Sequence, residues 1–209
     1  MPVEIPTQQP IRLGILLSGR GSNFLAIAES IRAGRLPGVE IAVVISNVED
    51  APGIAAAADL GLSHAVLVSK GRKRAEHDAD VVALLKEHKV DLVCLAGYMR
   101  LLSAGFVSAF PHRILNIHPS LLPAFPGLDA QQQALDYGVK VAGCTVHFVD
   151  EELDHGAILL QRTVAVLDSD DAHALADRIL VEEHLAYTEA IARVASGEYE
   201  IRGRRYVRK

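Results

Sequence analysis

The chain has 209 residues, a mass of 22.5 kDa, 50% hydrophobic residues and a formal net charge of −5 at pH 7. This length can bury one sizeable core, and the composition excludes a disordered or low-complexity chain. The acidic balance argues against a nucleic acid as the main partner, because basic residues are clustered only in the C-terminal tail 202–209. We therefore expect a flexible N-terminal extension, residues 1–10, followed by one soluble domain, residues 11–209.

The cysteine content and the apolar stretches indicate the cellular location. Cys94 and Cys144 are the only cysteines, too few for a disulfide framework and without the paired spacing of a zinc site. No apolar stretch reaches the roughly 20 residues that cross a bilayer, and the first ten residues do not resemble a signal peptide. These features predict a cytoplasmic protein without membrane contact.

Strand-like and helix-like segments alternate along most of the chain. Apolar runs rich in β-branched residues predict seven strands: Ile11–Leu17, Glu40–Ile45, His64–Val68, Asp91–Ala96, Arg113–Ile117, Val141–Val149 and Ile158–Val166. Segments with helical periodicity lie between the first five: Asn23–Ala33, Gly53–Leu60, Arg74–His88 and Ser103–Phe110. Such alternation indicates parallel strands joined by right-handed crossovers.

The last two predicted strands are joined by Asp150–Gly156 without a helix, so we expect an antiparallel hairpin, followed by a long helix over Asp171–Ala195. The predicted fold class is therefore α/β: a Rossmann-like, mostly parallel, twisted sheet of about seven strands with helices on both faces. In such sheets the ligand binds outside the carboxyl ends of the strands.

A glycine-containing loop, Ser18–Asn23, connects the first strand to the first helix. Its glycines allow close backbone approach, and the free amides at the helix start suit a phosphate. We expect Ser22 or Asn23 to cap that helix. A plain strand-to-helix turn has the same composition, so both interpretations stay open. The third glycine of a dinucleotide fingerprint and the lysine of an NTPase loop are missing, which favours a monophosphate.

Asn116 and His118 lie two residues apart near the end of a predicted strand, so their side chains share one face of the sheet. Pro119 and Pro123 stiffen the exit from that strand. A histidine in this position can be a core residue with a satisfied partner. An asparagine beside it at a strand end favours a functional role.

The acidic turn between the last two strands ends in Asp154-His155-Gly156. We interpret Glu151 and Glu152 as solvated turn residues. Asp154 stands where the chain re-enters a strand, a position that can return it to the site. The sequence has no metal-ligand spacing and no Gly-x-Ser-x-Gly elbow, so we predict neither a metal site nor a serine hydrolase.

Five segments together resemble the phosphoribosylglycinamide formyltransferases, a family of 10-formyl-tetrahydrofolate enzymes. From about Ile11 to Val194 they are LSGRGSN, VVISN, DLVCLAGYMRLLS, ILNIHPSLLPAFPGL and GCTVHFVDEELDHG, in the family's order. HPSLLP with a downstream Asp-x-Gly is typical of the wider group, and the glycine-serine-asparagine loop indicates this family. The stretch Asp129–Gln133 departs from the family, which often has a histidine there.

The resemblance implies formyl transfer from 10-formyl-tetrahydrofolate to the amine of glycinamide ribonucleotide in purine biosynthesis. The residues that it implies are Asn116, His118 and Asp154 for catalysis; Gly21, Ser22 and Asn23 for the phosphate; Glu183 and Pro119 for the ribose and amine; and Arg74, Met99, Arg100, Leu101, Leu102, Asn116 and Val149 for folate. It also implies a phosphate-binding half, about 11–110, and a folate-binding catalytic half, about 111–200. No metal is implied, and a monomer and a homodimer both fit.

The residue types suit direct transfer without a covalent enzyme intermediate. Amine attack on a formyl carbon places negative charge on oxygen, which Asn116 and a protonated His118 can stabilise. A neighbouring Asp154 favours the imidazolium and can accept the amine's proton through water. The alternatives are a formyl-folate hydrolase, a formyltransferase acting on aminoacyl-tRNA or a sugar nucleotide, and a nucleotide-binding module without chemistry. The tRNA alternative calls for a second, basic domain and the hydrolase for a regulatory domain, and we expect neither here.

Overall fold

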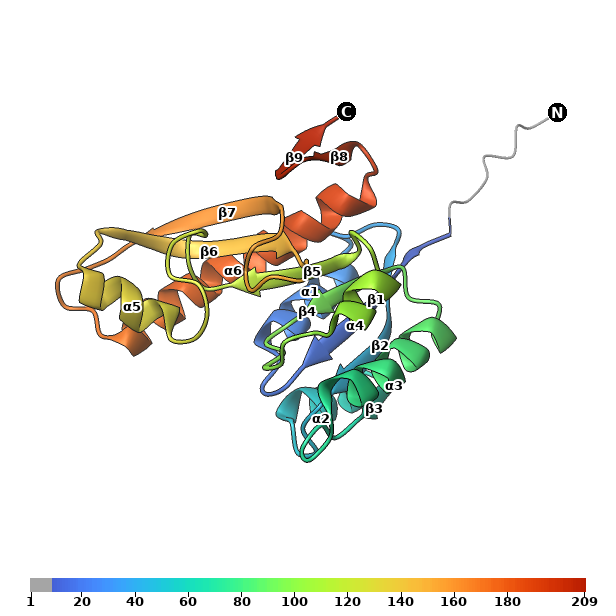
Figure 1. The fold of residues 1–209 in the computed structure, drawn as a ribbon. Helices are drawn as coiled ribbons and strands as arrows, with labels where there is room; N and C mark the ends of the chain where they lie inside the picture. Colours follow the sequence, from blue (N-terminus) through green and yellow to red (C-terminus); the bar gives the residue numbers. More distant parts are fainter. Residues whose placement is uncertain (1–8) are drawn as a thin grey trace.

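The computed structural model describes residues 9–209, which form nine strands and six helices (Figure 1). The strands are β1 Ile11–Leu17, β2 Val39–Ser46, β3 His64–Val66, β4 Leu92–Leu95, β5 Ile114–His118, β6 Val141–Phe148, β7 Ile158–Ala165, β8 Tyr199–Arg202 and β9 Arg205–Arg208. The helices are α1 Ser22–Arg32, α2 Pro52–Asp59, α3 Arg74–Glu87, α4 Ala104–Ala109, α5 Ala130–Tyr137 and α6 Ala172–Ala195. Most of the predicted extension 1–10 lies outside the described residues.

The strands of the described part form one sheet with the order β3-β2-β1-β4-β5-β6-β7-β9-β8. The strands from β3 to β5 pair in parallel, and β6 pairs antiparallel with both β5 and β7. The mostly parallel sheet and the hairpin predicted from the sequence are therefore confirmed. β2 lies on one side of β1 and β4 on the other, so the crossovers diverge at the carboxyl ends of β1 and β4.

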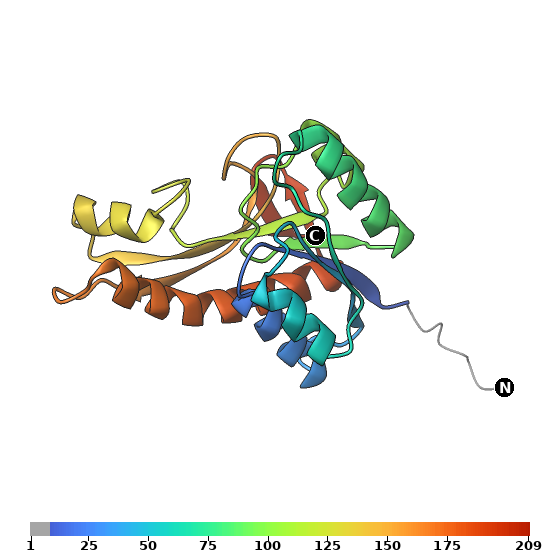
Figure 2. The same cartoon turned by 90° about the horizontal axis from the view of Figure 1, so that it is seen from below.

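Helices cover both faces of the sheet, as predicted (Figure 2). On one face α1, α2 and α6 pack against the sheet, and their buried residues include Phe24, Ile27, Ala57, Tyr187 and Ile191. On the other face α3 and α4 pack through Val81, Leu85, Phe106 and Phe110. α5 lies against α6 near the β6–β7 hairpin. Burial on both faces explains why the parallel strands are continuously apolar.

Three elements were missed by the sequence analysis. α5 begins in the Asp129–Gln133 segment, with Asp129 in a left-handed conformation at its start. The basic tail forms the hairpin β8–β9, which extends the sheet from β7 through the pair Ile158 and Arg205. The sheet therefore has nine strands in the described part of the chain, not about seven. Within residues 9–209, no helix is both long enough and apolar enough to cross a membrane.

Candidate functional site

β5 places Asn116 and His118 on one face of the sheet. Leu115 and Ile117 point into the core beneath α6, so the alternation predicted for this strand is confirmed. Asn116 lies beside Leu95 at the carboxyl end of β4, next to the point where the crossovers diverge. The side chain of His118 is buried, whereas that of Asn116 is half-buried.

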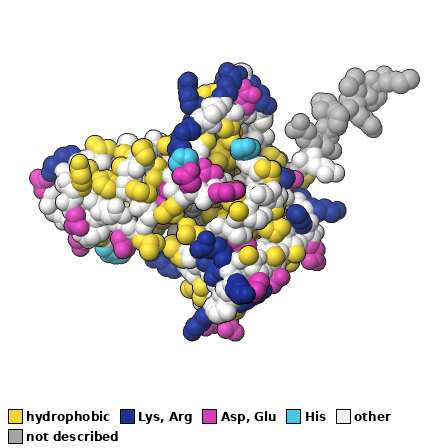
Figure 3. All heavy atoms as spheres, viewed as in Figure 1, with side chains coloured by type: hydrophobic (Ala, Val, Ile, Leu, Met, Phe, Trp, Pro, Cys, Tyr) yellow, Lys and Arg dark blue, Asp and Glu magenta, His cyan; other side chains and the backbone are white. Residues whose placement is uncertain are grey.

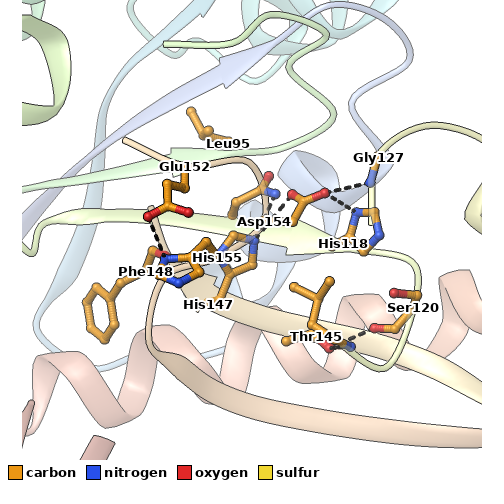
Figure 4. Close-up of polar contacts among 12 residues, drawn as sticks. Leu95, His118, Ser120, Gly127, Thr145, His147, Phe148, Glu152, Asp154 and His155 are labelled. Atoms are coloured by element: carbon orange, nitrogen blue, oxygen red, sulfur yellow. Dashed lines mark hydrogen bonds and ion pairs between the residues drawn. The ribbon is translucent and has the colours of Figure 1, made fainter. Parts of the chain in front are cut away.

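The β6–β7 turn, residues 149–157, brings Asp154 to His118. The turn starts beside the amino end of β5, where the Val149 amide donates to the Ile114 carbonyl at 2.9 Å. It then folds back, so that Asp154 Oδ2 lies 3.5 Å from His118 Nδ1 and accepts from the Gly127 amide at 2.8 Å (Figure 4). The structure thus brings the predicted imidazole and carboxylate together from distant parts of the chain.

Both ring nitrogens of His118 face oxygen acceptors. Nε2 donates to the Phe125 carbonyl at 2.8 Å, while Nδ1 faces Asp154. The Phe125 carbonyl is presented by the segment after β5, which Thr145 holds by donating to the Ser120 carbonyl and accepting from the Leu122 amide. Because Nε2 donates to Phe125, Nδ1 carries a proton only when the ring is an imidazolium; in that form Nδ1 can donate to a substrate oxygen, since the 3.5 Å contact to Asp154 is longer than a hydrogen bond.

His147 is a site residue that the sequence analysis missed. It lies opposite Asn116 in the β5–β6 ladder, and its Nδ1 contacts the Phe148 carbonyl at 2.9 Å. A carbonyl only accepts, so Nδ1 carries the proton and Nε2 of the neutral ring accepts from Asn116 Nδ2 at 3.2 Å. This contact orients the Asn116 amide and leaves its second N–H for a ligand. Finding His147 from the sequence would have required the strand register.

Burial lowers the pKa of His147 from its ordinary value of 6.5, an effect that the Phe148 carbonyl and Asp154 only partly oppose. As the pH falls below 6.5, His147 is therefore protonated in the unfolded chain at a higher pH than in the folded chain. We expect full stability above pH 6.5 and a loss of up to about 1.4 kcal/mol per pH unit as pH falls from 6.5 toward the lowered pKa. The free energy of unfolding, measured with urea from pH 7.5 to 5.5, should fall less steeply with pH for His147→Gln than for the wild type. The exposed His173→Gln should keep the wild-type slope, and an equal slope for His147→Gln would contradict the assignment.

The glycine loop precedes α1 with a geometry that differs from the expected cap. Gly21, rather than Ser22 or Asn23, is the N-cap residue; it has φ 71°, and within the described chain no side chain caps the helix. The predicted cap was wrong because the left-handed turn at Gly21 already starts the helix. The first helical amides, which include those of Ser22 and Asn23, thus point past the helix start and are free of a side-chain cap.

Asn23 instead contacts α6. Its Nδ2 donates to Glu183 Oε2 at 2.8 Å, which joins two residues that the resemblance assigns to the same substrate. Burial raises the pKa of Glu183, opposed by the Asn23 hydrogen bond and by the nearby His118. Asn23 Oδ1 is buried and has no donor in the described part of the protein, which is typical of an atom that meets a ligand.

Apart from Asn116, the predicted folate residues lie in three places: the loop after β4, the start of α3 and the end of β6. Met99 and Leu101 expose 70% and 52% of their surface, far more than is usual for apolar residues near a core. Leu102 and Val149 pack against the core beneath α3 and α4, while the Arg100 guanidinium approaches the Ser69 carbonyl at 3.5 Å. Arg74 is exposed at the first residue of α3. This face is hollowed between acidic and basic side chains (Figure 3).

Pro119 lies away from this group. Together with Phe125 and Tyr137 it lines an apolar pocket of about 400 Å³ on the α5 side of the sheet. Its predicted contact with the ribose or amine stays a prediction. Among the side chains of residues 9–209, no group of three or more His, Cys, Asp and Glu is arranged to hold a metal ion.

Fold and site define an α/β protein of the Rossmann-like class, with an amide, an imidazole and a carboxylate beside a helix N-terminus. The formyl transferase family model matches residues 11–191, and the chain belongs to this family. It is similar to glycinamide ribonucleotide transformylase 1 from Symbiobacterium toebii, with 50% identity, a TM-score of 0.94 and coverage of 97% of this chain and 95% of that chain.

Two curated relatives differ strongly in length. Phosphoribosylglycinamide formyltransferase of Mycobacterium tuberculosis (strain CDC 1551 / Oshkosh) is 40% identical over 203 residues, which cover 97% of this chain and 94% of that protein. The trifunctional purine biosynthetic protein adenosine-3 of Drosophila melanogaster is 43% identical over 193 residues, 91% of this chain. This chain spans only 14% of the length of the trifunctional protein.

Proposed function

We propose that this protein transfers the formyl group of 10-formyl-tetrahydrofolate to the amine of glycinamide ribonucleotide. The observation that carries the proposal is the meeting of His118 and Asp154 at 3.5 Å, beside Asn116 and next to the crossover point of the sheet. Membership of the formyl transferase family and similarity to glycinamide ribonucleotide transformylase 1 support the choice of reaction and substrate.

In this proposal the substrate amine attacks the formyl carbon and the bond from that carbon to the folate nitrogen breaks. Negative charge develops on the formyl oxygen, where the free N–H of Asn116 and Nδ1–H of His118 donate, each worth about 3 kcal/mol in the transition state. Asp154 accepts the proton released by the amine through water and passes it on to the folate nitrogen, which leaves as the free amine, so no net proton is gained or lost. The charges therefore balance without a metal ion or a covalent enzyme intermediate.

The phosphorylated amine binds along the start of α1. The unpaired amides and the helix dipole favour its phosphate at Gly21, Ser22 and Asn23. Its ribose hydroxyls reach Glu183, which accepts, and Asn23 Oδ1, which lacks a donor in the described chain. In this proposal the ribose position directs the amine toward Asn116 and Asp154.

Formyl-folate is the co-substrate in this proposal. The exposed Met99 and Leu101 offer an apolar surface for its ring system, and the exposed Arg74 offers a cation for its carboxylates. Arg100, Leu102 and Val149 complete the proposed folate site. The proposed division is a phosphate-binding half, about 11–110, and a folate-binding catalytic half, about 111–200; Arg74 and residues 99–102 of the folate site lie within the first. A cytoplasmic location and a monomeric or homodimeric state stay predictions.

An absorbance assay of formyl-folate consumption tests the proposal directly. We expect consumption that depends on glycinamide ribonucleotide, with formylglycinamide ribonucleotide and tetrahydrofolate formed in equal amounts. Consumption of equal rate without the amine would indicate the hydrolase instead. No consumption with or without the amine would favour a binding module without chemistry.

The Glu183→Gln substitution is expected to affect substrate binding and folding stability in opposite directions. Glutamine still accepts from Asn23, but it removes the buried charge whose desolvation raises the pKa of Glu183. We expect a higher melting temperature at pH 7.5 and a KM for glycinamide ribonucleotide raised about tenfold, the loss of one charge-assisted hydrogen bond. The KM for formyl-folate should change little. Half-buried Glu182, on the same helix, has its own partner in Arg162, so Glu182→Gln serves as the control for lost charge on α6. An unchanged KM for the ribonucleotide would remove Glu183 from the binding site.

A further inference from the structure

Arg204, in the turn between β8 and β9, contacts the β6–β7 turn that carries Asp154. Its Nη1 contacts His155 Nε2 and its Nη2 donates to the His155 carbonyl. His155 Nδ1 in turn contacts Asp150 Oδ2 at 2.9 Å. Since Nδ1 donates to that carboxylate, Nε2 of the neutral ring is free to accept from Arg204. One guanidinium thus binds both the ring and the backbone of the residue after Asp154.

The hairpin that carries Arg204 is itself fixed to both ends of the β6–β7 turn. The Tyr206 ring packs on Phe148, the last residue of β6, with ring centroids 5.4 Å apart. Arg205 pairs with Ile158, the first residue of β7. Tyr199 stacks on Tyr206, and Arg193 of α6 lies over the Tyr199 ring. These contacts hold the hairpin, and with it Arg204, beside the β6–β7 turn.

The β6–β7 turn needs such support because its course is strained and tightly packed. Asp154 has φ 50°, a left-handed conformation that costs a non-glycine residue about 1 kcal/mol or more. Any side chain at position 156 would place its Cβ 1.9 Å from the Phe148 carbonyl, so Gly156 lies hard against the end of β6. Across the site, one hydrogen bond from the Gly127 amide holds the Asp154 carboxylate.

We propose that Arg204 is a positioning residue: it holds the β6–β7 turn through His155, and so keeps Asp154 at His118. The inference rests on the proposed function for Asp154. The hairpin lies beyond residues 11–191, the range that the family model matches. Acidic side chains, a histidine and the basic side chains of the hairpin gather on this surface (Figure 3).

The test compares Arg204→Ala with Arg202→Ala in the full chain. Arg202 lies in the same hairpin but pairs with Glu200, so its removal takes the same charge without touching the β6–β7 turn. We expect Arg204→Ala to lower kcat about tenfold, because small misplacement of a reacting group is costly, while both KM values stay within twofold. Arg204→Lys, which can keep one of the two contacts, should recover part of kcat. Arg202→Ala should match the wild type.

Hydrogen–deuterium exchange supplies a readout that does not depend on activity. Arg204→Ala should speed exchange in peptides covering 150–157 and at Gly127, with unchanged exchange in β1 and α1. Unchanged exchange there and a kcat within twofold of Arg202→Ala would overturn the positioning role. A parallel rise of both KM values with faster exchange throughout the protein would also overturn it. If the wild type forms no formylglycinamide ribonucleotide, the proposed function fails, whereas the exchange data still decide whether Arg204 holds the turn.

Discussion

Replacing Asp154 by asparagine is expected to lower kcat for formyl transfer about 10³-fold, within the range for loss of a positioned proton acceptor. The substitution suits this position. Asparagine tolerates the left-handed conformation that Asp154 adopts, and its carbonyl oxygen can still accept from the Gly127 amide. The variant therefore keeps the turn but loses the negative charge facing His118 and the site that receives the amine's proton.

Asp168→Asn is the matched control, because Asp168 is exposed and pairs with Lys140 at the surface. We expect this control to keep wild-type kcat and both variants to keep the wild-type melting temperature within a few degrees. Steady-state kinetics at saturating substrates measure the effect. A kcat for Asp154→Asn within a few-fold of the control would show that the carboxylate takes no part in proton transfer.

The sequence predicted the part of the fold that local patterns specify. The strands β1 to β7 were placed to within a few residues, since β-branched apolar runs such as Ile11–Leu17 and Val141–Phe148 are buried on both faces. α5 was missed because its glutamine-rich start, after the left-handed Asp129, has little apolar periodicity.

The C-terminal hairpin was missed for a different reason. β8 and β9 have four residues each, and so short a hairpin is marginal by itself. Its stability comes from contacts with Arg193 at the end of α6 and with Phe148 and Ile158, and the last two lie far away in sequence. The available signal was the alternation of apolar and charged residues over Tyr199–Arg202, followed by Gly203 and by the apolar pair Tyr206 and Val207.

The site was predictable where spacing alone determines geometry. Asn116 and His118 share a face because they are two residues apart on a strand, and the structure confirms it. The approach of Asp154 to His118 was expected from the resemblance, but its route was not, since the β6–β7 turn starts at the amino end of β5 and folds back. His147 and Arg204 depend on strand register and on docking of the tail, which no local pattern contains.

Asn116→Ala is expected to lower kcat about 10²- to 10³-fold with little change in either KM, as for the loss of one oxyanion donor. The reason lies in the His147 contact. One N–H of the amide is used by His147 Nε2, so the other is fixed in direction before substrate binds. Asn116→Asp, which keeps the size but replaces donors by a negative charge near the developing oxyanion, should lose at least as much activity as the alanine variant.

A double-mutant cycle with His147 tests that orientation. His147→Leu fills the buried site but removes the acceptor, so the Asn116 amide can rotate; we expect kcat to fall about tenfold, roughly one neutral hydrogen bond. His147→Gln, whose carbonyl can accept from Asn116, should recover part of the loss. The double variant Asn116→Ala, His147→Leu should be no slower than Asn116→Ala, because we expect the ring to act through the amide rather than through Asp154, whose Oδ1 lies 3.8 Å from His147 Nε2. Multiplicative losses in the double variant would show instead that His147 acts on the substrate independently of Asn116.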